Sequence, residues 1–152
     1  MPRSPTQPRG LWRCPKCGRG FANRNQSHSC SDVSLQSHFK GKSEHVRDLF
    51  DALTAMIKKY GPVKVLPEKT RIAFQVRMSF IAVQVRQNHL IGHFVFARRV
   101  EHPRFTRVET FSPRNHLHAF RLDSLSDLDE EFTGWICEAY AVGEQKHLRR
   151  ER

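Results

Sequence analysis

The chain has 152 residues, of which 38% are hydrophobic and 27% charged, and its formal net charge is +11. This length allows one ordinary domain with a small appendage, and no apolar run approaches the ~20 residues needed to cross a bilayer. Residues 1–13 lack the apolar stretch of a signal peptide. These features exclude a membrane-spanning protein and predict a cytoplasmic one.

The positive charge is unevenly distributed. Residues 1–42 carry a net +7 and residues 43–125 another +7, whereas residues 126–145 carry −6. An excess of this kind favours a polyanionic partner, above all nucleic acid. The alternative is a solvated basic surface that has no such partner.

Composition divides the chain into a disordered basic tail, a zinc knuckle, a linker, an α+β domain and a second basic tail. The predicted boundaries are 1–10, 11–30, 31–42, 43–142 and 143–152. The first tail is rich in Pro and Arg, and the linker is rich in Ser.

The zinc knuckle is predicted from a Cys-x2-Cys doublet, Cys14 and Cys17, followed by His28 and Cys30. This spacing lets two thiolates occupy adjacent corners of a tetrahedron, and clustered thiols in a reducing compartment more often hold metal than form disulfides. Three sulfurs and one imidazole leave no position open for water, so the predicted cofactor is one structural Zn²⁺. His38 could replace His28 or Cys30, and reduced thiols in a flexible segment are the alternative to any metal site.

Two amphipathic helices are expected. Ser43 is a suitable N-cap for a helix over residues 43–60, which Gly61 and Pro62 end. A second helix begins near a capping box made by Ser126 and Asp129.

Alternating apolar and polar residues predict strands at 70–77, 79–86, 89–97, 107–111 and 116–122, with a tight turn at Gln87-Asn88. The resulting fold is α+β: a five-stranded antiparallel meander with the N- and C-terminal helices packed on one face. The other face of the sheet is expected to stay partly open.

Arginine and lysine side chains on the knuckle and near the strand ends are candidate phosphate contacts, because a guanidinium donates bidentate hydrogen bonds to phosphate. Phe105, Phe111 and His102 lie among them and could stack on bases. Scattered surface arginines are the alternative. The candidates are Arg13, Lys16, Arg19, Arg24, Arg71, Arg77, Arg86, Arg98, Arg99, Arg104, Arg107 and Arg114.

Two further patterns bear on catalysis and metal binding. His116 and His118 share one side of a strand and could bind a metal or an anion, or could be ordinary strand histidines. The sequence contains no complete catalytic constellation, no nucleophile elbow and no glycine-rich phosphate loop.

The segments LWRCPKCGRGFANRNQSHSC, HVRDLFDALTAMIKKYGPVKV and DLDEEFTGWICEAY, with the hairpin RIAFQVRMSFIAVQVRQNHLIGHFVF, carry a family resemblance. Over roughly residues 11–142 the chain resembles uncharacterised bacterial proteins in which a domain of unknown function follows a Cys/His knuckle. The strands and the acidic last helix are also similar to bacterial double-wing DNA-binding proteins, whose fold is frataxin-like. Neither resemblance implies a catalytic residue.

The leading hypothesis is a zinc-binding, non-enzymatic protein that binds nucleic acid or is associated with it. A protein-interaction adaptor is the alternative, and a metal-dependent hydrolase is a distant third. The sequence identifies no small-molecule substrate, and it does not separate DNA from RNA.

Overall fold

The computed structural model describes residues 11–15, 20–21 and 34–146. Helix α1 (Glu44–Lys58) begins where the sequence predicts, because the Ser43 side chain accepts a hydrogen bond from the Val46 backbone N–H at 3.2 Å. Its buried stripe consists of Val46, Leu49, Phe50, Leu53 and Ile57.

Helix α2 (Glu130–Gly143) is also present, but the predicted capping box is wrong. Asp129 is itself the N-cap and accepts from the Phe132 backbone N–H at 2.9 Å. Ser126 lies inside a short 3-10 helix, η2 (Leu125–Asp127), so it cannot be the extended residue that precedes a helix.

The main sheet is antiparallel and has six strands, not the predicted five. Its order is β3-β4-β5-β6-β8-β7, so it is not a simple meander: β8 pairs with β6, and β7 lies outside it as an edge strand. The unpredicted strand is the other edge, β3. The strands are β3 (Lys64–Pro67), β4 (Ile72–Gln75), β5 (Ser79–Val85), β6 (Leu90–Phe96), β7 (Arg107–Ser112) and β8 (Asn115–Leu122).

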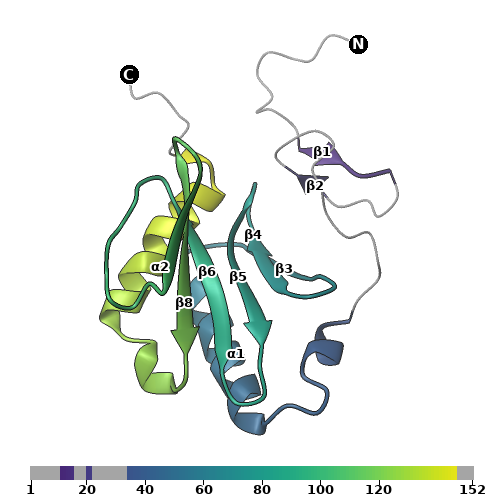
Figure 1. Cartoon of the computed structure of the whole chain (residues 1–152). Helices are drawn as coiled ribbons and strands as arrows, with labels where there is room; N and C mark the ends of the chain where they lie inside the picture. The colour runs from purple at the N-terminus through teal and green to yellow at the C-terminus, as the bar shows by residue number, and fades with distance from the viewer. Residues whose placement is uncertain (1–10, 16–19, 22–33, 147–152) are drawn as a thin grey trace.

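Both helices pack on one face of this sheet and leave the opposite face open, as Figure 1 shows. Phe94 of β6 is central to the core between them, with ring centroids 4.6 Å from Phe120 and 5.0 Å from Phe132. The α+β class and the placement of the helices therefore agree with the prediction.

The N-terminal part contains a small hairpin, in which β1 (Trp12–Arg13) pairs antiparallel with β2 (Gly20–Phe21). Within the interval predicted as a linker, Leu35–His38 forms a 3-10 helix, η1, and Leu35 and Phe39 pack against the core. Neither helix of the described residues is long and apolar enough to cross a membrane.

Candidate nucleic-acid interface

One row of side chains crosses the open face at a single register. His93 is central in it, because Ala82 of β5 is its partner on one side and Ala119 of β8 on the other. From edge to edge the row reads Leu66, Ala73, Ala82, His93, Ala119, Arg107. Short side chains on both sides of His93 lower the surface around the imidazole.

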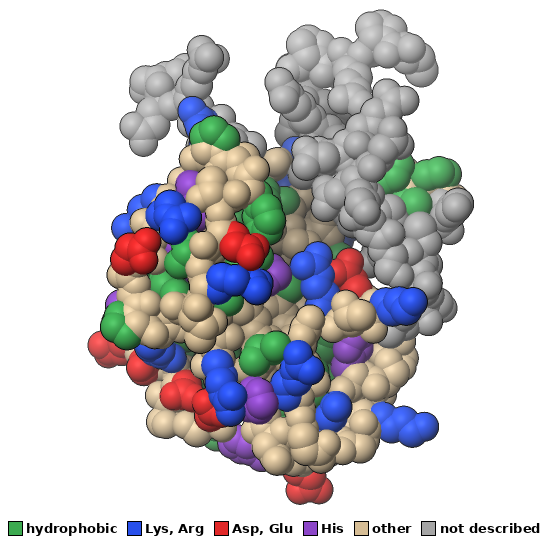
Figure 2. All heavy atoms as spheres, viewed as in Figure 1, with side chains coloured by type: hydrophobic (Ala, Val, Ile, Leu, Met, Phe, Trp, Pro, Cys, Tyr) green, Lys and Arg blue, Asp and Glu red, His purple; other side chains and the backbone are tan. Residues whose placement is uncertain are grey.

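The lowered surface is a hollow of about 600 Å³. Its apolar wall includes Ile91 and Leu117, and Phe111, at 67% exposure, lies at its rim. Figure 2 shows this face of the molecule, with Lys and Arg side chains on both sides of a recessed area.

Three arginines line the hollow: Arg71, Arg107 and Arg121. Arg107 belongs to β7 and Arg71 directly precedes β4, so each starts two strands from His93, about 10 Å at the usual strand spacing. Both side chains therefore line the hollow from opposite sides of His93, and the charges of both act on its imidazole.

Each of these arginines has an acidic neighbour. Arg71 Nε lies 2.8 Å from Glu68 Oε1, and Arg107 Nε lies 3.1 Å from Glu109 Oε1. Both contacts use Nε, and within the described residues the Nη groups of Arg71 and Arg107 donate no hydrogen bond. Arg121 is different, because its Nε donates hydrogen bonds to the Asp123 carboxylate and its Nη2 forms an ion pair with the same carboxylate.

His93 is neutral in this setting. Burial in the hollow lowers its pKa to about 4, and the positive charges of Arg71 and Arg107 act in the same direction. A neutral imidazole donates one hydrogen bond and accepts another. The floor of the hollow therefore offers a polar group that carries no charge of its own at pH 7.

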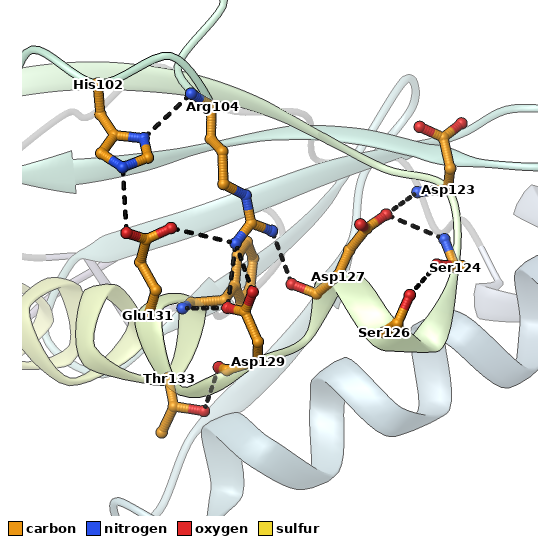
Figure 3. Close-up of polar contacts among 10 residues, drawn as sticks. His102, Arg104, Asp123, Ser124, Ser126, Asp127, Asp129, Glu131 and Thr133 are labelled. Carbon is orange, nitrogen blue, oxygen red and sulfur yellow. Dashed lines mark hydrogen bonds and ion pairs between the residues drawn. The ribbon is translucent and has the colours of Figure 1, made fainter.

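Two predicted contact residues face α2 instead of the hollow. Arg98 makes a bidentate pair with Glu138, with distances of 3.0 and 2.9 Å. Arg104 donates to both carboxylate oxygens of Asp129 and, at 2.6 Å, to the carbonyl of Asp127, as Figure 3 shows. The charge of each is compensated within the fold, so neither is available to the open face.

The remaining predicted contacts are dispersed. Arg77 donates to Gln145, and Arg86 to Gln84 beside the β5–β6 turn. Arg99 donates to Thr110 and pairs with Glu101. Arg114 lies in the β7–β8 turn and Arg13 in β1, whereas Lys16, Arg19 and Arg24 lie outside the described residues.

The histidine pair His116 and His118 is structural. His118 is fully buried; its Nε2 accepts from the Val100 backbone N–H at 2.8 Å, and its Nδ1 donates to the His116 carbonyl at 2.9 Å. His116 contacts Thr110 and the Pro113 carbonyl. Since both nitrogens of each ring have protein partners, neither ring is open to a metal or an anion.

Of the predicted zinc ligands, only Cys14 lies within the described residues, where it is buried. Cys17, His28 and Cys30 fall outside them. Among the residues that are described, no three His, Cys, Asp or Glu side chains gather as metal ligands.

The sequence prediction missed Arg121 and gave His93 no role. His93 could have been found from strand parity, because Leu90, Gly92 and Phe94 alternate on the core face and so place Ile91 and His93 on the other. The pairing of β6 with β8, which brings Arg121 beside Ile91, has no comparable sequence signal.

A family model for a domain of unknown function, DUF5655, matches residues 35–143. The chain belongs to this family. The match includes η1 and all the strands of the main sheet, and thus the whole hollow. No curated protein and no solved structure matches the chain.

Proposed function

We propose that this DUF5655 protein binds single-stranded nucleic acid on the open face of its sheet, without catalysing a reaction. The observation that carries the proposal is the placement of Arg71 and Arg107 on opposite sides of one hollow, which neither α1 nor α2 covers. The Nη groups of both arginines, which donate no hydrogen bond within the described residues, are suited to phosphate oxygens.

The composition of the surface favours a single strand over a duplex. The site is recessed, so it presents no protruding helix or ribbon that could enter a groove. Phe111, exposed beside the arginines, offers a ring on which an unpaired base can stack. The net charge of +11 adds a sequence-independent attraction that weakens with salt.

A zinc ion held by Cys14, Cys17, His28 and Cys30 remains part of the proposal. Its role is structural: with four protein ligands it would fix the segment that precedes the domain and place Arg13, Lys16, Arg19 and Arg24 near the same polyanion. Metal analysis of protein purified under reducing conditions tests it, with one zinc per chain expected.

Fluorescence anisotropy with a labelled single-stranded DNA of random sequence, and with the matching RNA, tests the proposed function. We expect Arg71→Gln and Arg107→Gln each to weaken binding, and each to make the salt dependence shallower by about one unit of slope. Arg98→Gln is the matched control, because Arg98 is paired with Glu138 and should leave affinity unchanged. Absence of binding at low salt, or equal losses in all three variants, would overturn the proposal.

A further inference from the structure

The hollow differs from the rest of the open face in depth and in chemistry. Its volume of about 600 Å³ lies within the range of pockets that hold small ligands. Apolar side chains line part of it, Arg71 and Arg107 line it from opposite sides, and His93 lies at its floor between Ala82 and Ala119. A ligand that fits this combination is of nucleotide size and has a flat apolar part and an anionic part.

We propose that the hollow is a pocket for one nucleotide that ends in a phosphate monoester. The phosphate would lie between the Nη groups of Arg71 and Arg107, with His93 as a further hydrogen-bond donor, and the base would pack against Ile91, Leu117 and Phe111. This inference rests on the proposed function, and it adds that the protein recognises the end of a strand.

The charge in the hollow supports a terminal phosphate over an internal one. Arg71, Arg107 and Arg121 line the hollow with Glu109 as the acidic group, while Glu68 and Asp123 pair with two of the arginines from outside the lining. A phosphate monoester carries up to two negative charges at neutral pH, whereas a phosphodiester carries one. The more highly charged group gains more from two guanidiniums that line the same hollow.

The pKa of His93 reports directly on whether an anion is bound in the hollow. In the free protein its pKa is held low by burial and by the charges of Arg71 and Arg107. A bound dianion would reverse the effect of those charges and raise the pKa, whereas a ligand bound elsewhere would not. Arg71 and Arg107 are the charged groups that lower this pKa, and Arg121 and Glu109 are the other charged groups that line the hollow.

A free mononucleotide and the 5′ end of a strand present the same phosphate chemistry, so separate probes are needed. The first experiment compares a single-stranded oligonucleotide that carries a 5′ phosphate with the same oligonucleotide that carries a 5′ hydroxyl. We expect the phosphorylated form to bind about tenfold more tightly to the wild-type chain. Ala119→Leu, which fills the hollow from its floor, and Arg107→Gln should remove that difference.

The second experiment titrates His93 by NMR in the presence of adenosine 5′-monophosphate, of adenosine and of inorganic phosphate. We expect the monophosphate to raise the pKa of His93 and adenosine to leave it unchanged. A smaller rise with inorganic phosphate would indicate that the base contributes to binding. A rise with the free mononucleotide, but no preference for the phosphorylated oligonucleotide, would overturn strand-end recognition.

Two outcomes separate this inference from the proposed function. Equal affinity for the two oligonucleotides, with no response of His93 to the monophosphate, would overturn the inference and leave the general binding proposal in place. Failure of both oligonucleotides to bind would overturn the proposed function and, with it, recognition of a strand end. Circular dichroism of Ala119→Leu serves as the folding control. Arg107→Gln tests the preference for the 5′ phosphate without changing the floor of the hollow.

Discussion

Gln75 donates a hydrogen bond from its side-chain amide to the carbonyl oxygen of Gly20 at 2.8 Å, across 55 positions of the chain. Gln75 belongs to β4 and is 1% exposed, and Gly20 belongs to the N-terminal hairpin. This contact joins the segment that contains the predicted knuckle directly to the sheet.

Replacing Gln75 by Leu should loosen the hairpin from the sheet. The substitution removes the donor and leaves the Gly20 carbonyl unsatisfied at a buried position, which costs about 1–3 kcal/mol. We expect faster proteolytic cleavage within residues 11–33, while the helices keep their circular dichroism. A Gln75→Leu chain cleaved at the wild-type rate would mean that this hydrogen bond does not hold the hairpin.

Arg104 and Arg107 should have opposite roles in stability and in binding. Arg104 is 25% exposed; it pairs with Asp129, and its guanidinium lies 5.5 Å from the ring centroids of Phe132 and Trp135. Arg104→Met should therefore lower the free energy of unfolding by about 1–2 kcal/mol, as measured by urea denaturation, and spare nucleic-acid binding. Arg107→Met should weaken nucleic-acid binding and leave the free energy of unfolding nearly unchanged, because the Arg107 side chain is 63% exposed.

Gly92 and Gly134 form a matched pair for alanine substitution. A Cβ atom at Gly92 would lie 2.5 Å from the Ala82 carbonyl oxygen and 2.9 Å from the Phe120 ring, so Gly92→Ala must displace backbone. Gly134 is in α2 with nothing within 4 Å of such an atom. We expect Gly92→Ala to lower the melting temperature strongly or to prevent folding. Gly134→Ala should stabilise the chain by up to about 1 kcal/mol. A lower melting temperature in both variants would contradict this account.

His93 should make the protein less stable in acid. Its pKa is about 4 in the folded chain and close to 6.5 when unfolded, so the unfolded state takes up the proton first as the pH falls. Its contribution is therefore fully present above pH 6.5 and is lost between pH 6.5 and about 4. Over this interval the free energy of unfolding of His93→Gln should fall less than that of the wild-type chain. The difference between the two falls should be about 1–3 kcal/mol. Parallel curves for the two proteins would show that His93 is not desolvated.

Both helices and the β5–β6 hairpin could be predicted from the sequence, because their signals are local. Ser43 caps α1 as expected, and the Arg86 backbone N–H donates to the His89 carbonyl across the turn at Gln87-Asn88. β3 was missed because its four residues end at Pro67 and follow Pro62, two residues that usually indicate a loop.

The order of the last two strands could not be predicted, because nothing in the sequence of β7 or β8 specifies which of them pairs with β6. The same limit applies to the site. Arg98 and Arg107 look alike in the sequence, and only the folded chain places one against Glu138 and the other over the hollow. The depth of the hollow depends on Ala82 and Ala119 meeting on either side of His93, which is a long-range property.

The two tryptophans of the chain lie in different parts of the fold. Trp12 belongs to the N-terminal hairpin, and Trp135 lies in α2 with its ring centroid 4.5 Å from that of Phe105. Intrinsic fluorescence of a Trp12→Phe chain would therefore follow melting of the helix layer, and that of a Trp135→Phe chain would follow detachment of the hairpin. The protein thus carries a separate optical label for each of these two events.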